Sequence, residues 1–359
     1  MKSNNKKVIF WQTEIIDLIE NKPIGGIAVQ MYFWSQIFAN NGWQVYSFAK
    51  NIERDIKRCN VVFKPLRNIR FINLLLEWWL ALKYIICIRP EIIISRGASR
   101  VLLPLSIFAK LFSTKLVFFS ASDVNFEPGN ELVGSWLNRK QYQCSIRHIN
   151  YFVTQNQYQH DTLLTNYGKD SIVLFNIWGE VPLLNKIESK TFDAVWIANF
   201  RRLKRAEWVI DAAEELPEYV FAMAGRDGAD GDYYEVMKSK ADAVSNIRFH
   251  GGVSFAAANE LVSSAKVLLC TSTFEGFPNT FLQAWSNGIP VISTVDPSGI
   301  IKSNNLGEVV SSYKELITAI ERILGDKDYY QTLCSSVTSF FQKTHAAQPG
   351  YNKLMKYLN

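Results

Sequence analysis

The sequence lacks the cysteine and histidine patterns of metal centres and redox sites. Its five cysteines are an odd number, lie far apart and show no paired spacing, so we interpret them as core residues of a protein from a reducing compartment. They are Cys59, Cys87, Cys144, Cys270 and Cys334. The four histidines show neither metal-ligand spacing nor a nucleophile–base pattern. We therefore expect no metal and no metal catalysis.

A dinucleotide-binding motif and a secretion signal are missing as well. The segment Gly225–Gly228 lacks the spacing of a G-x-G-x-x-G motif, so the dehydrogenase class loses its main support. Near the N-terminus, Gln12 and Glu14 interrupt an apolar run too early for a signal peptide. We expect a cytoplasmic protein that needs no cofactor.

One long apolar run is present, from Phe71 to Ile88, but it is slightly short for a membrane span. Glu77 and Lys83 would also lie inside the hydrocarbon layer, where charges are costly. We interpret the run as a helix packed on a sheet. The alternative is a shallow helix at a membrane surface, because aromatic residues within the run and basic residues beside it suit a headgroup layer. The basic neighbours are Arg67, Arg70 and Arg89.

Composition indicates a globular protein with an uneven charge. The chain has 359 residues, of which 48% are hydrophobic, so it can bury two domain cores. Residues 1–190 contain 23 Lys and Arg against 14 Asp and Glu, and residues 191–359 contain 16 against 19. The first half therefore carries a net charge of +9 and the second of −3. Two explanations of the positive charge on the first half remain open: it attracts an anionic acceptor or surface, or it is ordinary surface charge that keeps the protein soluble. We expect no nucleic acid partner.

Strand-like and helix-like segments alternate along the chain, which indicates an α/β fold of doubly wound parallel sheets. In the first half a helix over Ile27–Asn40 lies between the strands Val8–Trp11 and Trp43–Ala49. Further strands are expected at Glu91–Ser95, Lys115–Phe119 and Ile149–Thr154. We expect an N-terminal domain over 1–180 and a linker over 181–192.

The second half repeats the alternation and predicts a second parallel sheet. Its short apolar strands are Ala194–Ala198, Val220–Ala224, Ile247–His250, Val267–Cys270 and Val291–Thr294. We expect this domain to span 193–335 and to be followed by C-terminal helices over 336–359.

The segment Lys266–Pro290 carries the most specific signal. The apolar strand Val267–Cys270 leads into a glycine turn that contains an acidic residue, and a helix expected over Phe281–Asn287 follows. The turn therefore lies at the carboxyl end of a parallel strand and beside a helix N-terminus. Ligands bind at such ends, and the unpaired amides and positive dipole end of the helix attract phosphate.

This segment resembles the donor-binding signature of the family 4 retaining glycosyltransferases, which have the GT-B fold of two Rossmann-like domains facing a central cleft. The family has a Glu at the position of Glu275 and a second Glu eight residues later, where this chain has Gln283. The resemblance implies that Glu275 holds the transferred sugar and that position 283 holds the ribose. From the residues alone, Gln283 fits equally well a capping box with Thr280. The other donor-binding residues expected in this segment are Gly276, Phe277, Pro278, Asn279 and Thr280.

Three other loops extend the resemblance. The segment 198–205 resembles the family loop in which an Arg and a Lys hold the donor diphosphate. Lys204 matches the family's Lys by spacing. The position of the family's Arg is occupied by Asn199, so we expect Arg201 to take the role of that Arg. Two further pairs of residues match positions of the donor site: Gly25 with Gly26, and Gly252 with Val253. Their glycines would let the backbone approach the donor.

In the first half, Asp123 follows the strand Lys115–Phe119. It would orient the acceptor hydroxyl, or it caps a loop or helix. The resemblance implies a retaining hexosyltransferase with a nucleotide-sugar co-substrate, a UDP- or GDP-sugar. Its acceptor would be a lipid-linked glycan of exopolysaccharide, capsule or O-antigen synthesis, met at the inner membrane face. The alternatives are a GT-B nucleotide-sugar epimerase and a non-catalytic sugar-nucleotide-binding subunit of an assembly complex.

Overall fold

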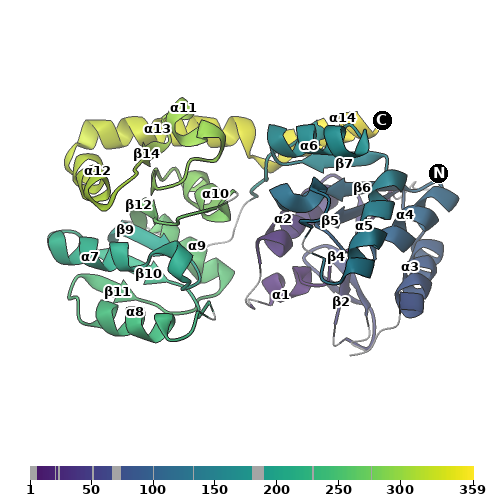
Figure 1. Ribbon diagram of the computed structural model, residues 1–359, viewed down its shortest axis with the longest axis horizontal. Coiled ribbons are helices and arrows are strands. Elements are labelled where there is room, and N and C mark those ends of the chain that lie inside the picture. The colour runs from purple at the N-terminus through teal and green to yellow at the C-terminus, as the bar shows by residue number, and fades with distance from the viewer. Residues whose placement is uncertain are drawn as a thin grey trace. The chain divides into compact units, whose positions relative to one another are not determined.

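The chain divides into two units, each with its own sheet. The computed structural model describes residues 6–20, 22, 25–50, 52–66, 74–99, 101–131, 133–179, 190–228, 230–275 and 277–359, with residues 74–77 as backbone only. Unit 1 comprises Met1–Gly179 and Ala346–Asn359, and unit 2 comprises Glu180–His345 (Figure 1). Of the linker expected over 181–192, residues 181–189 lie outside the described residues, and Phe192 is already the first residue of a strand.

Among the described residues, unit 1 contains an eight-stranded sheet in the order β3-β4-β2-β1-β5-β6-β7-β8. All neighbouring strands run parallel except β3 and β4, which are antiparallel. The strands are β1 (Lys7–Phe10), β2 (Gln44–Ala49), β3 (Ile56–Arg58), β4 (Val61–Pro65), β5 (Ile92–Arg96), β6 (Lys115–Phe119), β7 (Tyr151–Thr154) and β8 (Ile172–Val173). The central strands are runs of buried apolar residues because helices cover both faces of the sheet.

The helices of unit 1 are α1 (Ile15–Ile19), α2 (Gly26–Asn40), α3 (Leu74–Ile88), α4 (Leu102–Leu111), α5 (Trp136–His148), α6 (Gln157–Tyr167) and α14 (Ala347–Leu358). Helix α3 is formed by residues of the apolar run from Phe71 to Ile88. One of its faces buries Ala81 and Ile85 in the core, whereas Trp79 and Ile86 are exposed. Among the described residues, none of the helices combines the length and apolar content that crossing a membrane requires.

The last residues of the chain complete the core of unit 1. The side chains of Tyr351, Leu354 and Leu358 on α14 are buried, and the indole N–H of Trp43 donates a 2.8 Å hydrogen bond to the Tyr351 hydroxyl. Helix α14 packs against α2. The return to unit 1 begins at Ala346, whereas residues 336–345 belong to unit 2.

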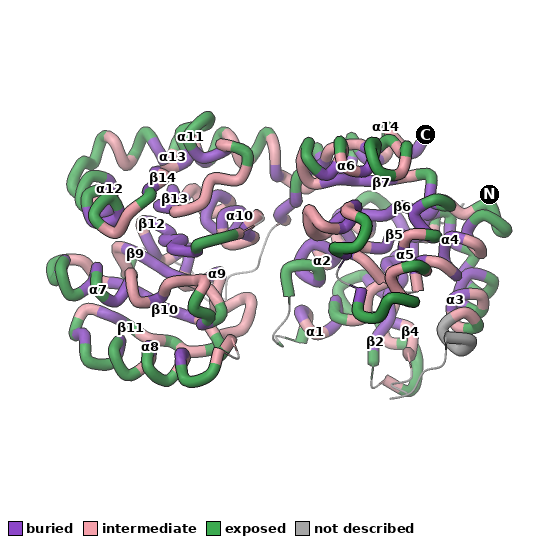
Figure 2. Tube along the Cα trace, viewed as in Figure 1, coloured by how far each residue is buried: buried purple, intermediate pink, exposed green. Residues whose placement is uncertain are grey.

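Unit 2 contains a six-stranded parallel sheet in the order β11-β10-β9-β12-β13-β14 among its described residues. The strands are β9 (Phe192–Ile197), β10 (Phe221–Ala224), β11 (Ile247–Phe249), β12 (Ala265–Cys270), β13 (Val291–Ser293) and β14 (Gly307–Val309). The helices are α7 (Glu207–Glu215), α8 (Tyr233–Asp242), α9 (Phe255–Ser263), α10 (Asn279–Ser286), α11 (Ile300–Asn304), α12 (Tyr313–Gly325) and α13 (Lys327–Thr344). Figure 2 shows buried strands beneath helices with exposed outer faces in both units.

The predicted parallel α/β architecture is confirmed, but the interpretation of the cysteines as core residues is wrong for three of them. Cys59, Cys87 and Cys144 are exposed, and only Cys270 among the five is fully buried. Cys59 lies in the turn between β3 and β4 with a φ of 45°, and the other two lie on the outer faces of α3 and α5. The spacing of the cysteines along the sequence argues against a paired metal or redox site. It does not show which of the thiols are exposed in the fold.

Candidate donor-binding site

The candidate site lies at the carboxyl edge of the unit 2 sheet, beside its central strand. Strand β9 lies between β10 and β12, so successive crossovers run outward from β9 in both directions. The loops that follow β9 and β12 therefore diverge at this edge, which is where open α/β sheets bind ligands. The loop after β9 covers residues 198–206, and the loop after β12 covers residues 271–278.

Lys204 and Glu275 meet between these two loops. The ammonium of Lys204 donates to Glu275 Oε1, and the two side chains are only 17% and 22% exposed. Ser272 Oγ donates to the same carboxylate oxygen at 3.2 Å. Removing either side chain would leave the other as a partly buried charge without a counterion, which is costly. Each side chain of the pair therefore stabilises the other in its position. The two residues that the sequence assigned to sugar and diphosphate are thus brought together.

Arg205 joins the loop after β9 to the loop after β12 by hydrogen bonds. Its Nε donates to the Thr271 carbonyl at 2.5 Å and its Nη2 to the Ser272 carbonyl at 3.2 Å, while the guanidinium lies 4.0 Å from the centre of the Trp208 ring. The Thr271 hydroxyl contacts the carbonyl oxygen of Lys204 at 2.6 Å. Arg205 also has a positive φ of 48°. These contacts fix the backbone on either side of the Lys204–Glu275 pair.

Two glycines of the neighbouring loop are required by close backbone packing. A Cβ on Gly225 would lie 1.7 Å from the Ala198 carbonyl oxygen, and one on Gly228 would lie 2.6 Å from the Phe200 carbonyl oxygen. The loop after β10 therefore rests directly on the loop after β9. Sequence reasoning considered this glycine pair only as a failed dinucleotide motif, although two glycines after an apolar strand do indicate close backbone approach.

Gln283 is buried in α10, and the predicted capping box is wrong. The residue preceding the helix is Pro278, which has no side chain that could cap it, and no side-chain cap is formed. Gln283 is 4% exposed, and its amide nitrogen has no hydrogen-bond partner among the described residues. A buried donor without a partner costs free energy.

Phe277 belongs to an aromatic cluster behind the second loop. Its ring lies 6.2 Å from Trp285 and 5.7 Å from His345, measured between centroids, and His345 is fully buried. The cluster connects the loop to α10 and to the end of α13. Gly276, which precedes Phe277 in the predicted donor site, lies outside the described residues.

The remaining predicted residues of unit 2 lie at the same edge. Asn199 and Arg201 are exposed, and the part of the chain that is described gives their side chains no partner. Gly252 and Val253 follow β11, and Asn279 and Thr280 begin α10. Arg202 instead lies on the outside, where its backbone N–H donates to Asp230 at 2.8 Å.

In unit 1, the predicted residues lie at the start of α2 and after β6. Gly25 precedes α2, and a Cβ placed on it would meet nothing within 4 Å, so local packing does not require glycine there. Gly26 is the first residue of α2. Asp123 follows β6 and accepts hydrogen bonds at Oδ1 from Asn156 and Gln159, at 3.1 and 2.8 Å. The cap of its short 3-10 helix is Ser122, so the alternative of a capping Asp123 is wrong.

The donor set at the carboxyl edge of unit 2 is cationic and polar. Within the described residues, no group of three or more His, Cys, Asp or Glu side chains is arranged to hold a metal ion. The edge offers lysine and arginine nitrogens, hydroxyls and helix N-terminal amides, which are the groups that bind phosphate.

Comparison with known proteins agrees with this chemistry. Residues 185–336 match the family described as Glycosyl transferases group 1. The chain is 26% identical over 176 residues to the GtfA subunit of UDP-N-acetylglucosamine–peptide N-acetylglucosaminyltransferase of Streptococcus pneumoniae serotype 4, covering 46% of this chain and 34% of that protein. It is 27% identical over 159 residues to the lipopolysaccharide 1,6-galactosyltransferase of Salmonella typhimurium, covering 42% and 44%. The chain thus spans less than half the length of these two relatives.

Sucrose-phosphate synthase from Thermosynechococcus elongatus has the same fold over the whole chain. The TM-score is 0.70 with 13% identity, and 98% of both chains is covered. This likeness shows the fold, and the GT-B class predicted from the sequence is confirmed. The fold and the family match over residues 185–336 together support a glycosyltransferase.

Proposed function

We propose that the protein is a retaining glycosyltransferase of family 4, which moves a hexosyl group from a nucleotide-diphosphate sugar to an acceptor hydroxyl. The observation that carries the proposal is the partly buried Lys204–Glu275 pair between the loops that follow β9 and β12. It places a cation and a carboxylate side by side at the edge where a sugar diphosphate would bind.

The diphosphate would be held by cations and backbone amides. Lys204 and Arg201 supply positive charge, and the amides at the start of α10 point to the same edge. As the bond between the sugar C1 and the diphosphate oxygen breaks, its electron pair passes to the diphosphate. Charge develops there, so cations already in place stabilise the transition state more than the bound substrate.

The sugar and the ribose would be held by the two residues of the second loop and helix. Glu275 accepts hydrogen bonds from sugar hydroxyls. When the donor binds, the Lys204 ammonium leaves Glu275 and contacts a phosphate oxygen instead. The Gln283 amide nitrogen, which is buried and has no partner among the described residues, would donate to a ribose hydroxyl. A glutamine is neutral, so this hydrogen bond is weaker than the one a carboxylate would accept.

The acceptor oxygen would attack C1 from the face that the diphosphate leaves, which retains the anomeric configuration. The acceptor hydroxyl loses its proton to the departing diphosphate oxygen, so no protein nucleophile is needed. Asp123, whose Oδ1 is already bound within unit 1, would orient the acceptor through its other oxygen. The lipopolysaccharide enzyme among the relatives supports a lipid-linked glycan acceptor, met by a cytoplasmic protein at the inner membrane face.

A thermal-shift screen followed by a transfer assay tests this function. The full chain is first screened against UDP- and GDP-sugars, and a ligand at one hundred times its Kd should add about 2.7 kcal/mol to the free energy of unfolding. The donor that binds is then incubated with a lipid-linked glycan extract. Lys204→Ala and Glu275→Gln should each lower transfer about 100-fold.

Lys238→Ala is the matched control, because Lys238 forms an exposed ion pair with Asp242 on α8, away from the site. It should leave transfer unchanged. Unchanged transfer by both site variants would refute the proposal. An epimer of the donor sugar that forms without acceptor would instead identify an epimerase, and tight donor binding without transfer would identify a non-catalytic subunit.

A further inference from the structure

Unit 1 contains a cavity of about 330 Å³ that lies entirely within that unit. Strand β1 lies between β2 and β5, and the crossovers run outward from β1 in both directions, as they do from β9 in unit 2. The cavity lies beside the residues that follow β1 and β5, so it occupies the ligand-binding edge of this sheet. None of the donor-site residues assigned above lines it.

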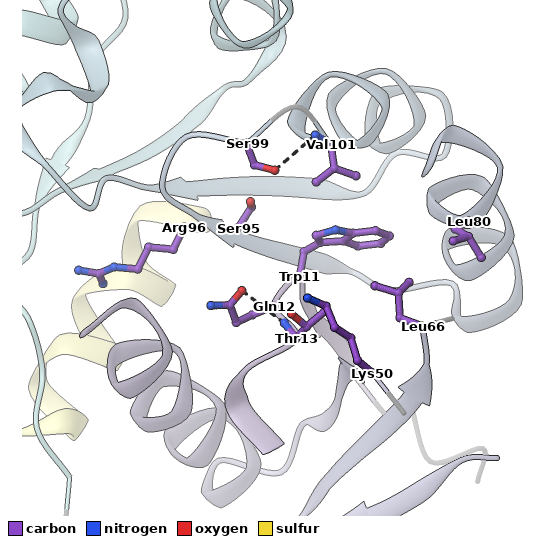
Figure 3. Close-up of a pocket in the computed structure, with 10 residues that line it drawn as sticks. All are labelled: Trp11, Gln12, Thr13, Lys50, Leu66, Leu80, Ser95, Arg96, Ser99 and Val101. Carbon is purple, nitrogen blue, oxygen red and sulfur yellow. Dashed lines mark hydrogen bonds between the residues drawn. The ribbon is translucent and has the colours of Figure 1, made fainter. Parts of the chain in front are cut away.

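The cavity has an apolar wall and a polar wall. Trp11 is its central aromatic residue, and Leu66, Leu80 and Val101 extend the apolar surface (Figure 3). The polar lining consists of Gln12, Thr13, Lys50, Ser95, Arg96 and Ser99. No acidic residue is among the ten lining residues. A ligand with a positive charge would therefore find no counterion, whereas a ligand with a negative charge and an apolar face would find both.

Lys50 and Ser95 are two polar residues of the lining that a ligand could contact. The Lys50 side chain is exposed and forms no ion pair with a described residue, and in Figure 3 its ammonium points toward Trp11 and Thr13. Ser95 is 2% exposed, lines the cavity, and has no side-chain hydrogen bond within the described chain. A hydroxyl that reaches a cavity without a protein partner is free to form a hydrogen bond with a molecule bound there.

Arg96 has a different role in the cavity. Figure 3 shows its guanidinium extending away from Trp11, and Nη2 donates to the Asn176 side chain at 2.7 Å. Among the described lining residues, Lys50 is consequently the cation that a ligand beside the Trp11 ring would contact. Ammonium groups bind phosphate as point charges, and they tolerate more than one geometry of the phosphate oxygens.

We propose that this cavity binds the phosphoryl group of the acceptor, with Lys50 on the phosphate, Ser95 on a phosphate or sugar oxygen, and an apolar face of the acceptor on Trp11. The inference rests on the proposed transferase function and names the chemical class of its acceptor. The apolar face is either the C–H face of a sugar that carries the phosphate or a prenyl chain attached to it.

Fluorine NMR of the full chain tests the inference without any donor. The ten tryptophans are replaced by 5-fluorotryptophan, and the Trp11 resonance is assigned by its loss in Trp11→Phe. Glucose 1-phosphate, farnesyl phosphate, glucose and inorganic phosphate are then titrated separately. We expect a saturable shift of the Trp11 resonance with at least one of the two phosphate esters, and a Kd at least fivefold weaker for Lys50→Gln.

Lys57→Gln is the control, because Lys57 is exposed on β3 and does not line the cavity. It should leave the Kd unchanged. A response to glucose 1-phosphate assigns the apolar face to a sugar, and a response to farnesyl phosphate assigns it to a prenyl chain. No response to either ester, equal binding of neutral glucose, or an unchanged Kd in Lys50→Gln would each overturn the inference.

The outcomes also separate this inference from the transferase function. A silent Trp11 resonance, in a protein whose transfer depends on Lys204, refutes the phosphate cavity alone. A Trp11 response in a protein that transfers no sugar refutes the transferase function and leaves a phosphate-binding cavity.

Discussion

At the scale of single residues, two buried glutamines differ in whether the described part of the protein pairs their side-chain amides. Gln159 is 1% exposed, and its amide bonds the Gln155 N–H, Ser120 and Asp123. Gln283 is similarly buried, but its amide nitrogen has no partner in the described chain. Burial of an amide is costly unless its hydrogen bonds are made, so the second glutamine must gain its compensation elsewhere.

This contrast predicts opposite effects of the same substitution. Gln283→Leu should leave the free energy of unfolding unchanged or raise it by about 1 kcal/mol, because it removes an unpaired buried donor. The same change should weaken donor binding about tenfold. Gln159→Leu should lower the free energy of unfolding by about 1 to 3 kcal/mol, since it leaves its partners unpaired. Denaturant unfolding and calorimetric titration with the donor measure both effects, and a destabilised Gln283→Leu would contradict the assignment.

The cysteines predict an order of chemical labelling. Cys59, Cys87 and Cys144 are exposed, whereas burial raises the pKa of the Cys270 thiol. A raised pKa lowers the thiolate fraction at pH 8, and burial also blocks access, so Cys270 should react last. Timed labelling of the native protein with a chromogenic disulfide, followed by peptide mass spectrometry, checks the order. Early modification of Cys270 would contradict the placement of β12 in the core.

At the scale of elements, the Arg205 contacts join two loops that are distant in sequence. Arg205→Ala removes two hydrogen bonds from a charged group to the Thr271 and Ser272 carbonyls. We expect unit 2 to lose about 2 to 3 kcal/mol of stability and the donor to bind more weakly, because the second loop is no longer held. Arg202→Ala is the control, since its side chain is 68% exposed and should contribute less than about 1 kcal/mol. Equal stabilities of the two variants would disprove this role of Arg205.

The sequence predicted those elements whose signal is local. The central strands of both sheets are buried apolar runs, and their positions agree with β1, β5, β6, β9 and β12. The strands β3, β4, β8 and β14 were not predicted. Of these, β3, β8 and β14 have only two or three residues each, and β3 reads Ile-Lys-Arg. Such short strands exist because a neighbouring strand offers them hydrogen bonds, which a local pattern does not contain.

The candidate site was predictable only in its outline. Parallel strands place their following loops at one edge, so the approach of the loops around Lys204 and Glu275 could be expected. Their direct ion pair, 71 residues apart, depends on the backbone of Arg205 and on Thr271, neither of which has a local signature. The capping box at Thr280 failed because the helix begins earlier, after Pro278.

At the scale of the whole molecule, the two C-terminal helices stabilise different units. Leu354 on α14 is fully buried in unit 1, and Leu333 on α13 is fully buried in unit 2. Leu354→Ala should lower the free energy of unfolding of unit 1 by about 2 to 5 kcal/mol, and Leu333→Ala should lower that of unit 2 by a similar amount. Each substitution should lower the melting temperature of its own unit alone. Differential scanning calorimetry resolves the two transitions, and the bound donor should raise the melting temperature of unit 2 more than that of unit 1, because most of the predicted donor-binding residues lie in unit 2. A single transition affected equally by both variants would contradict independent cores.

The position of α14 also has a consequence for biosynthesis. Ribosomes release a polypeptide from its first residue to its last, and domains commonly fold as they emerge. Unit 2 is complete in the nascent chain once His345 has left the exit tunnel, but unit 1 needs Tyr351, Leu354 and Leu358 from the final helix. The unit that is translated first is therefore the last to obtain all the residues of its core.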